Sequence, residues 1–198
     1  MRTLFFDIST HVMYIGYAEA DEIIDFSIRL AKRDHAKHIV DRIHQLLERN
    51  QVTLRDMDQI IVGKGPGSYT GIRIAGTVAK TLAYATNISL FQVSSLVFMT
   101  SGYQGLICAM QDARRGNVFS CIYEDNQVLH KDALRELESF KNEEDYKKSQ
   151  CIFVDEDTYS VDINTIRMHA TIVEDIHDYE PFYARITEAE QRANHSSK

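Results

Sequence analysis

The sequence predicts an α/β protein, and three observations lead to this fold class. Short apolar and aromatic runs at residues 3–8, 59–62 and 89–93 are too short for helices and indicate buried strands. Residues 34–49 and 69–85 carry apolar side chains at helical spacing, and the second segment lies between two of those strands. Strands separated by helices favour parallel pairing through crossover connections, so the first half belongs to the α/β class.

The first half is predicted to begin with strands at 3–8, 12–18 and 23–28, arranged as an antiparallel meander. The helix at 34–49 and the strand at 59–62 follow. A turn rich in glycine and proline at 63–67 then leads into the helix at 69–85, which Ser68 is placed to cap. After the strand at 89–93, Ser94 and Ser95 are expected to cap a short helix.

The second half is predicted to begin after a hinge at 100–105. Strands at 106–110 and 118–123 form a hairpin through the sequence DARRGN, and a third strand covers 127–131. Residues 134–148 indicate a charged amphipathic helix with Leu134, Leu137 and Phe140 directed inward, before a strand at 151–154. We therefore expect a first lobe at 1–102, a second lobe at 103–190 and a disordered tail at 191–198.

Composition restricts the classes of function. The 198 residues carry a formal charge of −7, from 22 basic and 29 acidic side chains, which argues against a chain devoted to holding nucleic-acid backbone. Cys108, Cys121 and Cys151 form no CxxC pair and are expected to be reduced and buried. A weakly charged N-terminus broken by Asp7 excludes a signal peptide, and no stretch is long enough to span a bilayer. The expected location is therefore the cytoplasm.

The helix at 69–85 has a second face formed by Tyr69, Arg73, Gly76, Lys80 and Tyr84. A glycine inside a helix costs about 1 kcal/mol relative to alanine, and close approach by another backbone is one reason to keep it. Tyrosine with arginine is typical of interface anchors, whereas a solvated face is the usual explanation for charged helix residues. We expect this face to dock against another chain.

Several segments share a family signature. They are FDIST at 6–10, RDH at 33–35, GPGSYTGIR at 65–73, VSSL at 93–96, DARRG at 112–116, and a closing segment with Pro181, Tyr183, Arg185 and EAE at 188–190. With these segments the chain resembles the TsaB family, also called YeaZ, of bacterial tRNA threonylcarbamoyladenosine synthesis. The resemblance covers the first 125 residues well and is weaker from 126 to 178.

The resemblance implies an actin-like, or sugar-kinase-like (ASKHA), fold of two lobes, each with a mixed sheet flanked by helices and the second shortened. It also implies a non-catalytic scaffold that activates TsaD, the related subunit that transfers threonylcarbamoyl to the adenosine next to the anticodon in tRNAs reading codons that start with A. Such proteins pair with TsaD through the two long helices of the first lobe. In isolated copies the same apolar helix face is expected to self-associate into a homodimer, because its exposure to water is unfavourable. Contact with tRNA is indirect, and a TsaE-like ATPase is left open as a further partner.

The partner interface expected from this resemblance, together with the glycine-bearing face, is one set of residues on the two long helices. It comprises His35, Ile39, Arg42, Ile43, Tyr69, Ile72, Arg73, Gly76, Lys80 and Tyr84.

A free-standing ATP-dependent phosphotransferase is the alternative function. Asp7, Ser9 and Thr10 offer an acid beside hydroxyls that suits hydrated Mg²⁺, but the second phosphate loop would have to come from residues 112–116, which hold one glycine. No glycine follows Gly116 to build an adenosine pocket. We expect a vestigial nucleotide or metal site at most, formed by Asp7, Ser9, Thr10 and Asp112. This subunit should require no cofactor, with ATP and Mg²⁺ confined to the complex.

A zinc peptidase is a third reading. His35 and His38 lie three residues apart on a predicted helix, with Asp34 nearby. No HExxH motif accompanies them, and we favour histidines at an interface or at the solvent edge over metal ligands.

Overall fold

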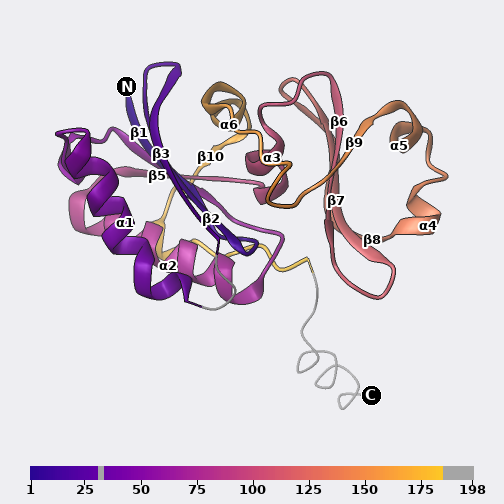
Figure 1. The fold of residues 1–198 in the computed structure, drawn as a ribbon, viewed down its shortest axis with the longest axis horizontal. Coiled ribbons are helices and arrows are strands. Elements are labelled where there is room, and N and C mark those ends of the chain that lie inside the picture. The colour runs from indigo at the N-terminus through magenta and orange to yellow at the C-terminus, as the bar shows by residue number, and fades with distance from the viewer. Residues whose placement is uncertain (31–33, 185–198) are drawn as a thin grey trace, which may run out of the picture.

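The computed structural model describes residues 1–30 and 34–184, and these fold into two lobes (Figure 1). The first lobe contains a six-stranded sheet of order β10-β5-β4-β1-β2-β3, and the second a four-stranded sheet of order β8-β7-β6-β9. The predicted two-lobed α/β architecture is therefore confirmed. Arg33, Arg185, the segment 188–190 and the predicted tail 191–198 lie outside the described residues.

The first sheet combines the predicted meander with parallel crossovers. Neighbours β1, β2 and β3 pair antiparallel, whereas β4 pairs parallel to β1 and β5 parallel to β4. The strands are β1 (Arg2–Asp7), β2 (Val12–Glu19), β3 (Glu22–Leu30), β4 (Gln59–Gly63) and β5 (Ser89–Val93). A short 3₁₀ turn, η1 (Leu54–Asp56), precedes β4.

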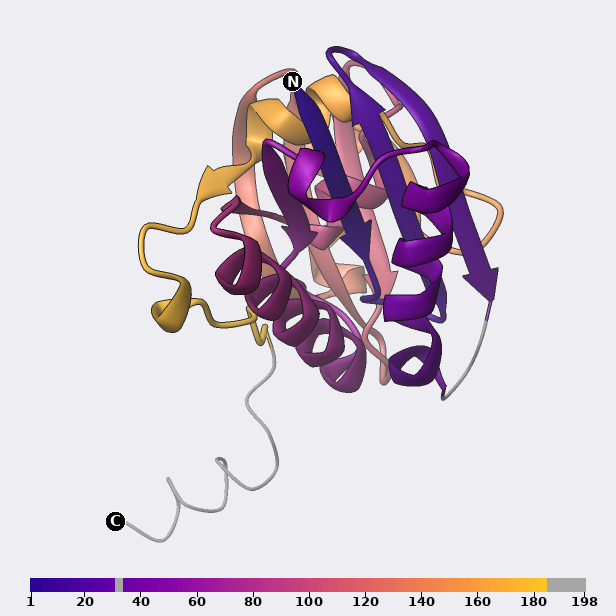
Figure 2. The same cartoon turned by 90° about the vertical axis from the view of Figure 1, so that its left-hand side faces the viewer.

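Two long helices, α1 (His35–Arg49) and α2 (Tyr69–Thr86), lie side by side over one face of this sheet (Figures 1 and 2). Their buried stripes join one core cluster with the sheet, and alanines on α2 allow that helix to lie close to the strands. The other face of the sheet receives α3 (Ser95–Thr100). The hydroxyl of Ser68 accepts the N–H of Gly71 at 3.3 Å, which confirms the predicted cap of α2. Ser94 caps α3 in the same way through the N–H of Val97.

The second lobe contains the predicted hairpin but not the predicted helix at 134–148. Its strands are β6 (Leu106–Asp112), β7 (Asn117–Glu124), β8 (Gln127–Glu136) and β9 (Gln150–Phe153). Residues 134–136 continue β8, because they pair with 117–119 of β7. Two short helices, α4 (Leu137–Phe140) and α5 (Glu144–Lys148), replace the long one. Phe140 is buried as expected, whereas Leu134 is exposed.

After β9 the chain returns to the first lobe. It forms α6 (Ile163–His169), then β10 (Thr171–Ile172), which pairs antiparallel with β5, then the 3₁₀ turn η2 (Ile176–Asp178) beside α2. The predicted lobe boundary at residue 102 therefore separates the two sheets. The returning segment, which the prediction placed in the second lobe, packs on the first.

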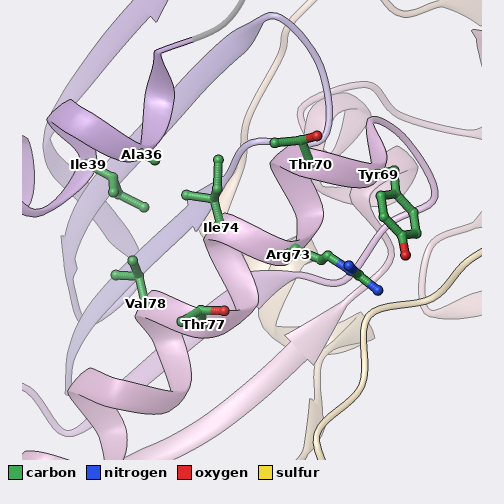
Figure 3. A pocket seen from close by; sticks show the side chains of 8 residues that line it. All are labelled: Ala36, Ile39, Tyr69, Thr70, Arg73, Ile74, Thr77 and Val78. Carbon is green, nitrogen blue, oxygen red and sulfur yellow. The ribbon is translucent and has the colours of Figure 1, made fainter.

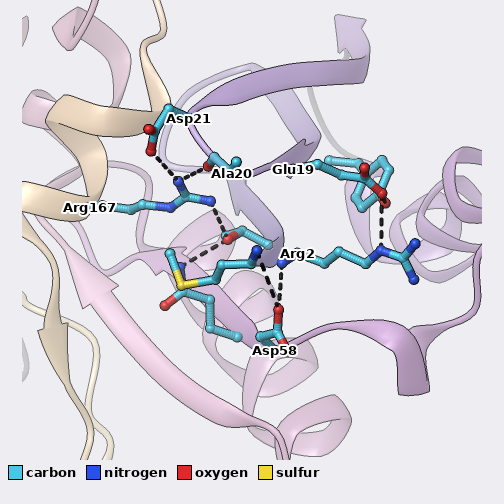
Figure 4. Close-up of polar contacts among 10 residues, drawn as sticks. Arg2, Glu19, Ala20, Asp21, Asp58 and Arg167 are labelled. Atoms are coloured by element: carbon cyan, nitrogen blue, oxygen red, sulfur yellow. Dashed lines mark hydrogen bonds and ion pairs between the residues drawn. The ribbon is translucent and has the colours of Figure 1, made fainter.

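The two lobes share a buried cluster in which Phe5 and Ile61 of the first sheet join Ile107 and Tyr123 of the second. Arg167 of α6 strengthens the connection, because its guanidinium donates to the Thr3 hydroxyl at 2.8 Å and to the Ala20 carbonyl (Figure 4). It also lies 3.5 Å from the Asp21 carboxylate. The returning helix is therefore held to the first sheet by polar as well as apolar contacts.

The structure also bears on the predicted state of the cysteines and on the prediction that no segment spans a membrane. Cys108 and Cys121 are buried, but Cys151 is exposed, so the expectation that all three are buried was wrong for Cys151; all three are free thiols. None of the helices in the described part of the chain has the length and apolar character needed to cross a bilayer.

Candidate functional site

The face of α2 that carries Gly76 is covered by the chain's own C-terminal segment. A Cβ at residue 76 would lie 2.6 Å from Cε1 of Tyr179, and the Tyr179 side chain is only 5% exposed. The prediction that this gap receives another chain is therefore wrong. The glycine does permit a close approach, but the group that approaches is an aromatic ring from residue 179.

The neighbouring residues of that face contact the same segment. Lys80 donates to the carbonyls of His177 and Tyr179 at 2.9 and 3.4 Å, and the Arg73 Nε donates to the Tyr183 hydroxyl at 2.8 Å. The Arg73 guanidinium also lies 4.0 Å from the centre of the Tyr69 ring. Tyr69 in turn packs against Tyr183, and Tyr84 packs edge-on against His177. We call residues 176–183 the C-terminal strap.

Sequence reasoning missed this strap, although a signal was available. In an otherwise polar stretch, apolar and aromatic groups recur every three or four residues, at Ile176, Tyr179, Phe182 and Tyr183. Such spacing indicates packing against a neighbour even where no helix forms. Phe182 is also bonded to the glycine turn, where its backbone N–H donates to the Lys64 carbonyl at 2.7 Å.

Several other predicted interface residues face the protein interior. Ile39 and Ile43 of α1 and Ile72 of α2 are at most 4% exposed and belong to the packing between helices and sheet. His35 is also buried, at 7% exposure. Arg42 is partly buried and donates to the Ser27 hydroxyl at 2.8 Å. Because these side chains are largely buried, they offer little surface for a partner to contact. Of the five, Ile39 is the one that lines a surface groove.

That groove runs between the outer surfaces of α1 and α2 and has a volume of about 430 Å³. Ile39 of α1 faces Ile74 and Val78 of α2 across it, while Tyr69 and Arg73 lie at one end (Figure 3). Ala36, Thr70 and Thr77 complete its lining, and all three are exposed. The groove thus offers an apolar surface formed by Ile39, Ile74 and Val78, with small side chains beside it and one guanidinium at its end.

The acid at the end of β1 is committed to the fold. Asp7 is fully buried, one carboxylate oxygen accepts from the N–H and hydroxyl of Ser9, and the other accepts from the Ser95 hydroxyl at 2.5 Å. A Cβ on Gly63 would lie 1.8 Å from this carboxylate, so the glycine provides its space. Burial raises the pKa of Asp7 above its ordinary value. Within the described residues this carboxylate is fully buried, and both of its oxygens already accept hydrogen bonds from Ser9 and Ser95.

The remaining residues of the predicted vestigial site are dispersed. Thr10 shares a hydrogen bond of 2.8 Å with Tyr159, and Ser9 is fully buried. Asp112 is exposed at the end of β6, where its carboxylate accepts the N–H of Arg114 at 2.8 Å and shapes the hairpin turn. Asp7 and Ser9 therefore lie together, whereas Thr10 and Asp112 serve other contacts. This arrangement contradicts a shared nucleotide or metal site formed by all four.

The histidine pair of α1 has separate environments. His38 is partly exposed and lies 3.3 Å from the Asp34 carboxylate, which Arg29 also binds in two hydrogen bonds of 2.7 Å, whereas His35 is buried. Because Arg29 donates to it, the pKa of Asp34 is lowered. Across residues 1–30 and 34–184, no cluster of three or more His, Cys, Asp or Glu side chains is arranged to hold a metal ion.

Comparisons with known proteins define the class of protein. The family model described as TsaD, tRNA N6-adenosine threonylcarbamoyltransferase, matches residues 28–152. The tRNA threonylcarbamoyladenosine biosynthesis protein TsaB of Bacillus subtilis is 37% identical over 127 residues, which cover 63% of this chain and 56% of that protein. The TsaB of Escherichia coli is 28% identical over 137 residues, covering 66% of this chain and 59% of that one.

Solved structures agree with these relatives. YeaZ from Pseudomonas aeruginosa superposes with a TM-score of 0.64 at 26% identity over 68% of this chain and 67% of its own. A protein described as uncharacterized, with similarity to peptidase YeaZ from Pseudomonas aeruginosa, gives a TM-score of 0.74 at 20% identity over 93% and 99% of the two chains. The chain therefore belongs to the TsaB (YeaZ) family, and its residues 28–152 match the TsaD family model. It spans 56% and 59% of the length of the two curated relatives.

Proposed function

We propose that this protein is a non-catalytic subunit in the synthesis of threonylcarbamoyladenosine in tRNA, and that it binds and activates a TsaD-like catalytic subunit in the cytoplasm. The names of the curated relatives support the pathway. The groove between α1 and α2 is the observation that carries the binding role. Adenosine next to the anticodon, in tRNAs reading codons that start with A, is the proposed site of modification, and this chain would contact tRNA only through its partner.

The outer surface of α1 and α2 suits a helical partner. Two long helices lie side by side, so ridges of a partner helix can enter the groove between them. Exposed apolar or amphipathic side chains lie on these two helices, with Tyr69 at the groove 43% exposed and Val40 of α1 55% exposed. Arg73, held over the Tyr69 ring, is already ordered before a partner arrives, which reduces the entropy lost on binding.

The revised interface differs from the set expected from the sequence. Ala36, Thr70, Ile74, Thr77 and Val78 line the accessible groove, and Val40 is exposed on α1. Tyr69 and Arg73 remain in the proposed interface, whereas Ile43, Ile72 and Gly76 support it from within the fold. Tyr84 packs against His177 of the C-terminal strap and is not part of the groove.

A catalytic role in phosphate transfer is less well supported. Such a role needs an acid that can reach Mg²⁺ or water, whereas the Asp7 carboxylate is enclosed by Ser9 and Ser95. The non-catalytic assignment rests on this enclosure. Titration calorimetry of the isolated chain with ATP and Mg²⁺ tests it, and stoichiometric binding together with ATP turnover that is lost in Asp7→Asn would refute the assignment.

The binding role is tested by Thr77→Arg. Thr77 is exposed at the groove, and arginine has the higher helix propensity, so the variant should fold normally while its long charged side chain fills the groove. Co-purification with the TsaD-like protein of the same cell should be lost. Asn126→Arg, which adds the same charge at an exposed turn of the second lobe, is the matched control and should still co-purify. Undiminished binding by Thr77→Arg would contradict the proposed surface.

A further inference from the structure

The edge of the first sheet formed by β3 is long and open. Strand β3 covers nine residues and stands last in the sheet order, so within the described residues its ladder partner is β2 alone. Figure 2 shows it as the outermost strand, with α1 in front of the sheet. An unpaired edge of this length presents a row of N–H and C=O groups that another strand can use.

The two faces of β3 differ in character. Toward α1, Asp25 accepts from Arg49 at 2.5 and 2.8 Å, Ser27 accepts from Arg42, and Arg29 binds Asp34. The alternating residues that follow the bulge at Ile24 are large and apolar, and they remain exposed: Phe26 at 52%, Ile28 at 45% and Leu30 at 57%. Phe26 is held in place by stacking on Tyr14, with ring centres 5.7 Å apart and planes 12° apart. Natural edge strands seldom leave such a row uncovered.

The sequence of β3 is self-complementary about Ser27. If two copies of β3 run antiparallel with their Ser27 residues opposite one another, each Asp25 lies opposite the other copy's Arg29, and each Phe26 lies opposite Ile28. We propose that β3 pairs in this register with β3 of a second copy of the chain, so that the first sheets of two copies form one continuous sheet.

Charge supports the same register. Within each copy, Asp25 already binds Arg49 and Arg29 already binds Asp34. Pairing about Ser27 places these ion pairs end to end across the twofold axis, so that positive and negative groups alternate along the row. A register shifted by two residues loses this alternation, and one shifted by a single residue turns the apolar side chains to opposite faces. The pairing does not use the groove between α1 and α2, so it is tested separately from the proposed function.

The first experiment measures mass by light scattering during gel filtration of the full chain. The protein should elute as a dimer, at twice the monomer mass of 22.8 kDa. Ile28→Lys should weaken dimerisation by about tenfold or more, because lysine on an edge strand opposes pairing and the ammonium group would have to lose water in the interface. Leu129→Lys is the matched control, since Leu129 is equally exposed, at 45%, on the edge strand β8, and it should remain dimeric. A monomeric wild-type chain, or a dimer broken by Thr77→Arg but not by Ile28→Lys, would overturn the proposal.

The second experiment tests the register by disulfide cross-linking with diamide, in a Cys151→Ser background because Cys151 is the exposed native thiol. Phe26→Cys and Ile28→Cys proteins are oxidised separately and as a mixture. Directly opposed positions should link, so the mixture should give a covalent dimer, while each variant alone should give little. Equal cross-linking in all three samples, or none in the mixture, would show that the strands are not paired about Ser27.

Discussion

Cε1 of Tyr179 lies 2.6 Å from the position that a Cβ would occupy on Gly76. Because residue 76 has no side chain, the Tyr179 ring can pack directly on α2 and so hold the C-terminal strap against this helix. The ring closes the side of α2 that faces away from α1, and Lys80 and Arg73 hold the strap on either side of it. This contact explains a helix glycine that the sequence alone assigns to a partner.

The Tyr179 side chain should contribute through its ring and not through its hydroxyl. The ring is almost fully buried, while its hydroxyl has no hydrogen-bond partner among the described residues. Tyr179→Ala should lower the free energy of unfolding by about 2–4 kcal/mol, because it leaves a cavity. Tyr179→Phe should be neutral or stabilising by up to about 1 kcal/mol, since it removes an unpaired buried hydroxyl. Urea denaturation measures both, and a destabilising Phe variant would reveal a partner for the hydroxyl.

Gly76→Ala should have opposite effects in two backgrounds. In the wild type the added methyl group meets the Tyr179 ring, so we expect a loss of about 1–2 kcal/mol. In the Tyr179→Ala background the ring is gone, and the same substitution should stabilise by up to about 1 kcal/mol through helix propensity. A double-mutant cycle on unfolding free energies measures the coupling. Additive effects would mean that the two residues do not touch in solution.

Asp132 should make stability depend on pH. It lies on β8 and accepts from the Ser94 hydroxyl at 2.7 Å, where burial raises its pKa to about 6. Since the folded pKa is above the unfolded value of 3.8, the folded state binds the proton more tightly, and stability from this group falls as pH rises through about 4 to 6. Above pH 6 the Asp132 carboxylate is charged in the folded state, and the full free-energy cost of burying that charge lowers the stability.

Asp132→Asn removes that cost while keeping an oxygen that can accept from Ser94. The variant should be more stable than the wild type at pH 7.5, by no more than about 3 kcal/mol, and the difference should shrink toward pH 4. Thermal melting across this pH range provides the measurement. A constant difference at all pH values would mean that Asp132 titrates normally.

Local patterns in the sequence predicted much of the first lobe. The turn at 63–67, the Ser68 cap and the alanine-rich stripe of α2 are short-range features, and they act in the structure as predicted. The helix predicted at 134–148 failed because Leu134 and its neighbours gain a ladder with β7, a long-range pairing that helical periodicity does not register. Tertiary contacts overrode local preference there.

The candidate site was only partly predictable for a related reason. The sequence identified α1 and α2 as the helices of interest, but it could not assign their faces, because residues more than ninety positions away along the chain decide which face is covered. Gly76 indicated that another group packs closely on α2, but the sequence did not show that this group is the Tyr179 ring of the same chain. Asp7 likewise carries the residue type of a nucleotide site, and only the positions of Ser9 and Ser95 reveal that its oxygens are already occupied.

The return of the chain to its first lobe has a consequence for synthesis on the ribosome. Strand β10 and the C-terminal strap complete the six-stranded sheet and cover α2, yet they are translated after the whole second lobe. The nascent first lobe therefore emerges with the side of β5 unpaired and the Gly76 face bare. Its maturation must wait for release of the C-terminal residues, so a stop codon before residue 171 would leave an unfinished N-terminal lobe for chaperones to hold.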